Sequence, residues 1–318
     1  MKELFEVTIE VTQKCPNKCT YCSSWSGLDK LEMLDYDLIC RIVDDAVELG
    51  AKLINVSGGE PLLHPSIVAI LRYIKSKRLK IRLYSSGIYY DDGFCSLPFS
   101  LLESIKYEVD TLIFNYEADS PELYARIMGT VPENLGVLDE TIKRAISLGI
   151  NVEAHIVPMK CNFRQIPYTI EKLYSIGVSN VSFLRLVCQG RSVENMDITL
   201  LSEDDELELI TMLTVLSDKY TGKIRLGKPY RMAKFSSCRT GTVRMAIRYD
   251  GYVFPCGAFK DGVMDINGVT PDNVRNKSLK DIYLTSEYFN KVRIMLSKYY
   301  ESEVIEPCFG QYYRSNLK

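Results

Sequence analysis

The chain has 318 residues, of which 46% are hydrophobic, and its 39 Lys and Arg residues nearly balance 41 Asp and Glu residues, giving a net charge of -2. This length can bury the core of one large α/β domain, or of a domain with a smaller appendage. No apolar run reaches the roughly eighteen residues that cross a bilayer, and no strongly basic block is present, so the sequence predicts neither a membrane protein nor a nucleic-acid-binding one. Residues 1–12 do not resemble a secretory signal, which favours a cytoplasmic protein with reduced cysteines.

Strand and helix patterns alternate over the first part of the chain. Six apolar or alternating segments are typical of strands, and five helix patterns separate them. The predicted strands are residues 5–11, 52–57, 80–87, 111–118, 151–158 and 180–187. Because such alternation is typical of parallel strands with right-handed crossovers, we expect an α/β fold in which the sheet curves into a partial (β/α)6 TIM-like barrel. Ligands of such sheets bind at the carboxyl ends of the strands.

The alternation ends at about residue 200. A helix pattern over residues 203–220 precedes two alternating runs within 242–259, and the turn sequence Tyr-Asp-Gly-Tyr between them predicts a hairpin. We therefore predict two domains: a barrel over residues 1–215 and a smaller α+β domain over residues 216–318.

Three cysteines, Cys15, Cys19 and Cys22, lie within eight residues directly after the first predicted strand. A structural zinc site normally has four protein ligands, and no fourth Cys or His is near in the sequence. Iron-sulfur clusters are also held by thiolates in compact loops, and three thiolates on a four-iron cluster would leave one iron open to another molecule. The spacing therefore favours a cluster, while a zinc site stays open as an alternative.

Two motifs together resemble the radical S-adenosylmethionine (SAM) superfamily: the C-x3-C-x2-C loop, with Tyr21 before its last cysteine, and Gly58-Gly59-Glu60-Pro61 after the second strand. The resemblance implies that the three cysteines hold a 4Fe-4S cluster whose open iron binds the amino and carboxylate groups of SAM. It also implies that an electron, supplied by a donor such as flavodoxin or ferredoxin, cleaves SAM to a 5′-deoxyadenosyl radical. This radical would abstract hydrogen from a substrate carbon.

The same resemblance implies that cofactor-binding residues lie at the strand ends. Missing Cβ atoms at Gly58 and Gly59 let the backbone approach a ligand, and in the family this stretch, with Glu60 and Pro61, meets the methionine amino group. An ordinary turn is the alternative. Residues at later strand ends would contact the ribose or the carboxylate of SAM: Ser85, Ser86, Asn115 with Glu117, and Lys160 with Asn162. An equal alternative for each is that it is simply a polar loop residue exposed to solvent.

Arg185 lies in an apolar run near the end of the sixth predicted strand. A buried Arg needs a charged partner, so we expect it to contact an anion, with a structural salt bridge as the alternative.

A second set of cysteines is Cys238, Cys256 and Cys308. The spacing Cys, twelve residues, Gly251, four residues, Cys resembles the auxiliary-cluster domain called SPASM, or twitch in its short form. The resemblance implies a second 4Fe-4S cluster whose fourth ligand is an unassigned residue or the substrate. The second possibility follows the GTP cyclases of molybdenum-cofactor synthesis, but a second close cysteine pair and a terminal Gly-Gly are absent here, so GTP is not carried over. Unrelated buried cysteines or a small zinc site are the alternatives.

Cys161 and Cys188 follow the fifth and sixth predicted strands, on the rim where the radical would form. Either thiol could return a hydrogen atom to a substrate radical or bind a cluster, and packing is the alternative for both. We expect an enzyme that dehydrogenates, epimerises or rearranges a small molecule, because the fourteen residues before Cys15 leave little room for a peptide-recognition domain. Modification of a ribosomally made peptide and a non-catalytic iron-sulfur or zinc scaffold are the other hypotheses.

Overall fold

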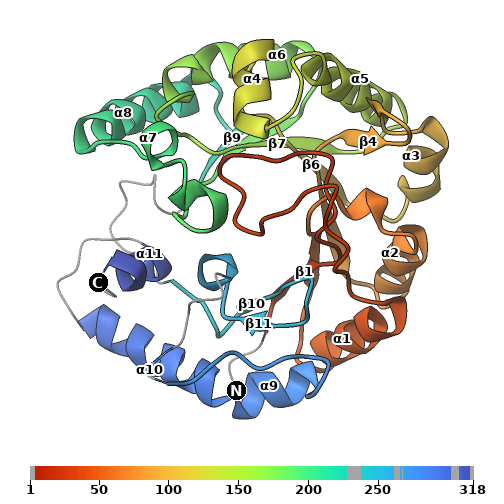
Figure 1. Cartoon of the computed structure of the whole chain (residues 1–318), viewed down its shortest axis with the longest axis vertical. Helices are drawn as coiled ribbons and strands as arrows, with labels where there is room; N and C mark the ends of the chain where they lie inside the picture. The colour runs from red at the N-terminus through yellow and green to blue at the C-terminus, as the bar shows by residue number, and fades with distance from the viewer. Residues whose placement is uncertain (1–3, 228–237, 261–265, 267, 302–307, 316–318) are drawn as a thin grey trace.

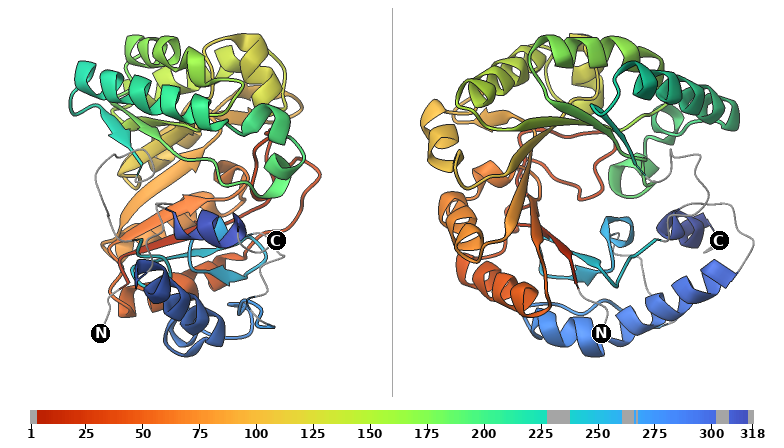
Figure 2. Two further views of the ribbon diagram at one scale, coloured as in Figure 1. Left: turned by 90° about the vertical axis from the view of Figure 1, so that its left-hand side faces the viewer. Right: turned by 180° about the vertical axis from the view of Figure 1, so that it is seen from behind.

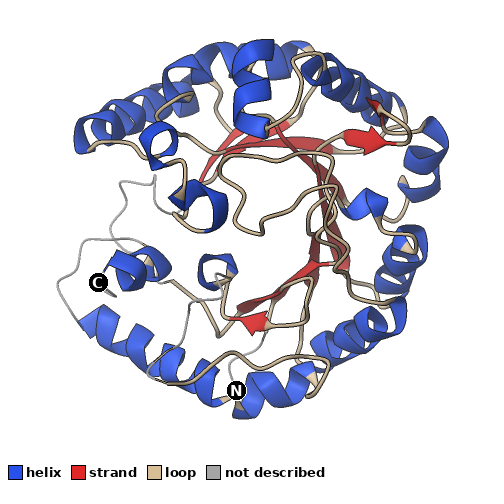
Figure 3. Cartoon of the chain, in the orientation of Figure 1, coloured by secondary structure: helices blue, strands red, loops and turns tan. Residues whose placement is uncertain are grey.

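The computed structural model describes residues 4–227, 238–260, 266, 268–301 and 308–315. Helices form an outer ring around a curved sheet, and the loop after the first strand lies inside this ring (Figure 1). Figure 3 shows the same arrangement with helices in blue and strands in red. The fold is a partial TIM-like barrel, as the sequence predicts.

All six predicted strands are present in one sheet, as consecutive parallel neighbours. Each is shorter than its apolar pattern, since the pattern continues into the loop that follows. The strands are β1 (Glu6–Glu10), β2 (Leu53–Ser57), β3 (Lys80–Ser85), β6 (Thr111–Asn115), β7 (Val152–Ile156) and β8 (Asn180–Phe183). A separate hairpin, β4 (Ile88–Tyr90) and β5 (Phe94–Ser96), follows β3.

The sheet continues beyond the six predicted strands on both sides. On one side β9 (Ile224–Leu226) pairs in parallel with β8. On the other, β10 (Arg244–Ile247) pairs in parallel with β1 and antiparallel with β11 (Val253–Phe254), so the predicted hairpin is confirmed. The sequence did not predict β9, nor that the hairpin would join the barrel sheet. The predicted division after residue 215 falls inside helix α8, and the domain limits stay a prediction.

Helices cover the outer face of this sheet (Figure 2). Helix α1 shows why they form: Asp35 caps its first turn through the Leu38 amide at 2.8 Å, and its apolar stripe is buried. The C-terminal helix α9 contacts α1, so the last part of the chain continues the ring. The longer helices are α1 (Tyr36–Glu48), α2 (Ile67–Ser76), α3 (Phe99–Ile105), α4 (Pro121–Met128), α5 (Asn134–Ser147), α6 (Ile166–Ser175), α8 (Glu203–Lys219), α9 (Leu279–Thr285), α10 (Glu287–Glu301) and α11 (Phe309–Ser315).

Short helices shape the loops: η1 (Pro61–Leu63), η2 (Phe163–Gln165), η3 (Gly190–Val193), α7 (Met196–Thr199) and η5 (Gly257–Phe259). The core lies between strands and helices, where side chains such as Ile54, Val56 and Leu83 are fully buried. Burial on both faces explains the near-continuous apolar runs of the parallel strands. Among the described helices, none is long and apolar enough to cross a membrane.

Candidate active site

A cavity of about 200 Å³ lies at the C-terminal ends of the first strands. The loop after β1 contributes all three of its cysteines to the wall, together with other residues of the same loop, and the ends of β2, β3 and β6 contribute most of the wall outside this loop. The lining residues include Cys15, Cys19, Tyr21, Cys22, Gly58, Gly59, Ser85, Ser86, Asn115, Arg191 and Lys260. The structure thus brings together residues that are far apart in the sequence, at the edge of the sheet where ligands are expected.

The glycines after β2 pack against the start of the cysteine loop. The Gly59 amide donates to the Thr12 carbonyl at 2.6 Å, and the Glu60 amide donates to the Lys14 carbonyl at 2.8 Å. A Cβ atom on Gly58 would lie 2.4 Å from the Thr12 oxygen, and one on Gly59 would lie 2.3 Å from the Lys14 oxygen. The close approach predicted for these glycines is therefore made to the chain's own backbone, and their contact with a cofactor stays a prediction.

Two further glycines, which no sequence motif marks, hold the same loop. Gly129 ends α4 at φ +58°, where a Cβ atom would lie 2.2 Å from the Lys18 oxygen. Gly190 has φ +59°, where a Cβ atom would lie 2.3 Å from the Cys22 oxygen. A glycine after a helix is a common end signal, but nothing in the sequence indicates which backbone it meets.

The chemistry of the three thiols fits an iron-sulfur cluster. Cys15 is buried, and Cys19 and Cys22 are partly buried. Burial raises the pKa of the Cys15 thiol, and the charge of Cys19 raises it further. Burial likewise raises the pKa of Cys19, as does the charge of Cys22. Three thiolates so close together need positive charge from bound metal, which a cluster supplies.

Within the described residues, no three His, Cys, Asp or Glu side chains are grouped so that they could hold one metal ion. The three thiolates of a cluster each bind a different iron and need not converge on one point.

Glu60 is fully buried and connects the glycine loop to the end of β3. Its carboxylate accepts hydrogen bonds from the Ser86 amide and hydroxyl, both at 2.6 Å, from the Ser85 hydroxyl at 3.0 Å and from the Leu62 amide at 3.1 Å. Burial raises its pKa, and the hydrogen bonds from Ser86 oppose that shift. Both serines line the cavity, but their hydroxyls already bind Glu60, while Pro61 opens η1 behind it. Cofactor contacts of these four residues stay a prediction.

A second buried carboxylate, Glu117, contacts two residues of the cavity wall, Tyr21 and Asn115. The Tyr21 hydroxyl donates to its Oε1 at 2.6 Å, the Asn115 amide donates to the same oxygen at 3.3 Å, and the Val157 amide donates to Oε2 at 2.8 Å. Burial raises the pKa of Glu117 to about 7. The carboxylate therefore fixes Tyr21 and Asn115 where both line the cavity.

The residues predicted at the ends of β7 and β8 do not line this cavity. Lys160 is exposed, and the Asn162 side chain bonds the carbonyls of Glu117 and Val157. Arg185 pairs with Glu206 on α8 at 3.3 Å, which is the structural alternative to an anion contact. Roles for Lys160 and Arg185 in binding the cofactor stay a prediction.

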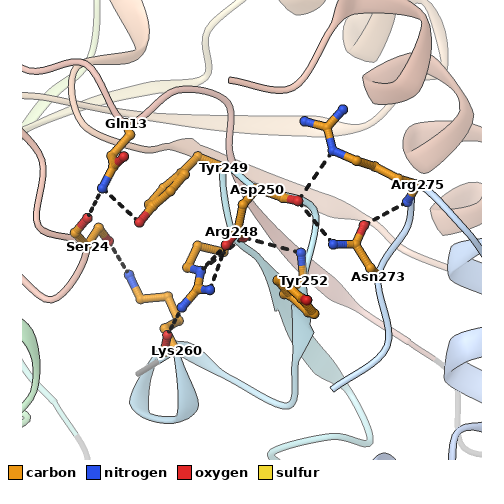
Figure 4. A network of polar contacts seen from close by, with 9 residues as sticks. All are labelled: Gln13, Ser24, Arg248, Tyr249, Asp250, Tyr252, Lys260, Asn273 and Arg275. Atoms are coloured by element: carbon orange, nitrogen blue, oxygen red, sulfur yellow. Dashed lines mark hydrogen bonds and ion pairs between the residues drawn. The ribbon is translucent and has the colours of Figure 1, made fainter. Parts of the chain in front are cut away.

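A buried ion pair, which no sequence pattern indicates, joins the cavity to the C-terminal part of the chain. Lys260 pairs with Glu10 at the end of β1 and donates to the Ser24 hydroxyl at 2.9 Å. Gln13 bonds the Ser24 carbonyl at 3.0 Å and the Tyr249 hydroxyl at 2.8 Å. Figure 4 shows the contacts of Ser24 with Lys260 and of Gln13 with Ser24 and Tyr249, next to the hairpin turn. The cysteine loop is thereby tied to the residues that follow Cys256.

The second set of cysteines lies around the β10–β11 hairpin and α11. Gly251 turns the hairpin at φ +91°, and Cys256 follows β11. Burial raises the pKa of the Cys256 thiol to about 11, and the charges of Cys238 and Cys308 add to that shift, so the three thiols are close enough to interact. This proximity agrees with the predicted auxiliary site, although the cluster ligands themselves stay a prediction.

The two rim cysteines lie in different places. The Cys161 amide donates to the Ile198 carbonyl, away from the cavity lining. Cys188 lies in a segment held near the auxiliary site: the neighbouring Gln189 donates to the Gly257 carbonyl at 2.6 Å, and Gln311 donates to the Leu186 carbonyl at 2.7 Å. Of the two, Cys188 is therefore the better placed for a role near a cluster.

Comparison with known proteins agrees with this arrangement. A family model described as the radical SAM superfamily matches residues 9–183, more than half of the chain. The chain belongs to the radical SAM superfamily. A second model, SPASM, described as an iron-sulfur cluster-binding domain, matches residues 238–310. The protein is therefore an enzyme whose cofactors are 4Fe-4S clusters and SAM, as the sequence predicts.

Proteins with several different names are similar to this chain over most of its length. A probable GTP 3',8-cyclase of Methanococcus maripaludis is 25% identical over 83% of this chain and 89% of its own. A PqqA peptide cyclase of Methylobacterium sp. is 26% identical over 89% of this chain and 74% of its own. The crystal structure of Streptococcus suis SuiB bound to S-adenosylmethionine superposes with a TM-score of 0.73 at 17% identity, covering 92% of this chain and 68% of SuiB. SuiB has also been solved with its precursor peptide SuiA.

Proposed function

We propose that this radical SAM enzyme modifies a peptide, using the cavity beside Cys15, Cys19 and Cys22 as its reaction site. When bound, the cluster would deliver one electron to SAM and so generate the radical that abstracts hydrogen from the substrate. The observation that supports this site is the placement of the three thiols on one cavity wall, next to the ends of β2, β3 and β6.

The chain's own residues would shape the site around these cofactors. The three cysteines would hold the cluster, and the backbone at Gly58 and Gly59 would border the methionine end of SAM. Tyr21 and Asn115, held by Glu117, would line the side where the nucleoside lies. Cys15 and Glu60 are buried, so the part of the wall that they form would exclude water from that side of the site.

The choice of a peptide rests on the relatives. The name of the PqqA peptide cyclase states a peptide substrate, and SuiB was solved with a precursor peptide. A small-molecule substrate is the second candidate, and similarity to a probable GTP 3',8-cyclase supports it. Two relatives with peptide substrates lead us to place the peptide first.

SAM cleavage tests the site itself. We expect Cys15→Ala, Cys19→Ala and Cys22→Ala to abolish formation of 5′-deoxyadenosine in an anaerobic dithionite assay. Cys40→Ala is the matched control, because Cys40 lies in helix α1 on the outer ring and should leave cleavage intact. Full cleavage by any of the three loop variants would refute the ligand assignment, and a wild type that never cleaves SAM would favour a non-catalytic scaffold.

The substrate class needs a separate experiment. The reconstituted enzyme would be incubated with deuterated SAM and either the peptide fraction or the small-molecule fraction of a cell extract. We expect mass spectrometry to find a peptide that gains label or loses mass. A labelled metabolite without any changed peptide would replace our proposal with the small-molecule candidate.

We further propose that Cys238, Cys256 and Cys308 bind the auxiliary cluster. The wild type should then reach about eight irons per chain after reconstitution, because each 4Fe-4S cluster holds four. Cys256→Ala should lower this to about four. A wild type that never exceeds about four would count against a second cluster.

A further inference from the structure

We propose that Arg191 is a positioning residue for the cluster at Cys15, Cys19 and Cys22, holding the cysteine loop in place and making the cluster easier to reduce. The inference rests on the proposed function, since it takes these three cysteines as the cluster ligands. Arg191 lies in η3, after β8, and lines the same cavity.

Arg191 contacts the cysteine loop at three carbonyl groups. Its Nε donates to the Cys19 oxygen at 2.8 Å, its Nη2 to the Ser26 oxygen at 2.9 Å, and its backbone amide to the Cys22 oxygen at 3.0 Å. The guanidinium thus bridges both sides of Cys22. Because its donors form a rigid fork, Arg fixes the spacing of these carbonyls in a way that a single ammonium cannot.

Neighbouring contacts hold Arg191 itself in place. The Asn195 side chain donates to the Arg191 carbonyl at 2.8 Å and to the Thr20 carbonyl at 3.3 Å. Gly190 lets the backbone touch the Cys22 carbonyl. Residues 190–195 therefore form a rigid support for the loop, with the guanidinium directed toward it.

Of the two cations described at this cavity wall, Arg191 is the one whose charge no described carboxylate neutralises. Lys260, the other cation described there, is paired with Glu10, whereas Arg191 has no ion pair with a carboxylate among the described residues. Glu60 and Glu117 add buried acidic groups nearby. An added electron makes the cluster more negative, so a nearby fixed positive charge stabilises the reduced form and raises the reduction potential.

Two variants separate the charge from the contacts. Arg191→Lys keeps the charge but loses the fork, whereas Arg191→Gln keeps an amide donor for one carbonyl but loses the charge. Arg164→Gln is the matched control, because this exposed arginine is paired with Asp205 and Glu208 and does not line the cavity.

The measurement is a redox titration of the reconstituted full-length protein followed by electron paramagnetic resonance. The cluster in question is identified as the one whose signal changes when SAM is added. We expect Arg191→Gln to lower its reduction equilibrium constant about tenfold, which is about 59 mV toward more negative potential for one electron. Arg191→Lys should stay near the wild-type potential but retain less iron, and Arg164→Gln should match the wild type in both.

The outcomes separate the two levels of the proposal. Equal shifts in the Lys and Gln variants, or none in either, would overturn the role of the charge. Wild-type iron retention in both variants would overturn the role of the contacts. If Arg191→Gln does not load a cluster, the charge is still tested by Arg191→Lys: a cluster that loads there with a lowered reduction potential would also refute the role of the charge. A SAM-responsive signal that survives in Cys19→Ala would instead show that the proposed ligand set is wrong.

Discussion

Gly190 offers a direct test of how closely the barrel rim holds the cysteine loop. In Gly190→Ala, the new Cβ atom would lie 2.3 Å from the Cys22 carbonyl oxygen, and real contacts of this kind are not found under 3.0 Å, so the carbonyl has to move by about 0.7 Å. A left-handed backbone also costs an alanine about 1–2 kcal/mol at this φ of +59°. Overpacking adds about 1–3 kcal/mol when the neighbour cannot move freely.

Gly222 provides a matched control for the cost of a left-handed backbone conformation. It has φ +78°, and a Cβ atom there would meet nothing within 4 Å among the described residues. Gly222→Ala should therefore destabilise the fold by only about 1–2 kcal/mol. We expect urea unfolding of the cluster-free chains to show a larger loss for Gly190→Ala than for Gly222→Ala, and iron content after reconstitution to fall only in Gly190→Ala. Equal values in both assays would refute the close packing of Gly190 against Cys22.

Three further predictions concern buried polar groups and the rim thiols. Burial lowers the pKa of His155 to about 3, compared with about 6.5 in the unfolded chain. Because His155 is then protonated only in the unfolded chain, the free energy of unfolding should fall by about 1.4 kcal/mol at pH 5.5. In urea unfolding, His155→Phe should remove this acid sensitivity. Lys260→Met leaves Glu10 buried without its partner, which should cost about 3–5 kcal/mol, and adding Glu10→Gln should recover part of that loss. Cys188→Ser should change the signal of the auxiliary cluster, its iron content or the modification of substrate. Cys161→Ser should change none of these three properties.

Each of these has a contradicting result. A pH dependence of stability that is unchanged in His155→Phe would show that the buried imidazole does not carry the effect. If the double variant at Lys260 and Glu10 is as unstable as Lys260→Met alone, the loss does not come from the unpaired carboxylate. An unaltered Cys188→Ser enzyme would leave packing as the role of that thiol.

The sequence was sufficient for the parts of this protein that depend on local chemistry. Alternating strand and helix patterns predicted the six central strands, because each pattern reports which face of one element is buried. The spacing of Cys15, Cys19 and Cys22 predicted the cluster loop, because three thiols that bind one cluster from a compact loop must be close in the chain. Turn chemistry at Gly251 predicted the β10–β11 hairpin, since two central turn residues determine a hairpin locally.

Only the tertiary structure decided which distant residues meet that loop. Four residues from segments more than a hundred residues away hold or border the cysteine loop, and no spacing pattern relates them to it. They are Gly129, Gly190, Arg191 and Lys260. For the same reason the sequence did not indicate Arg191, which the fold directs to the cavity. It did single out Arg185, which pairs with Glu206, and an anion contact of Arg185 stays a prediction. Periodicity records the burial of each element, but contacts between elements depend on how the barrel closes, and that is determined by the packing of the whole chain.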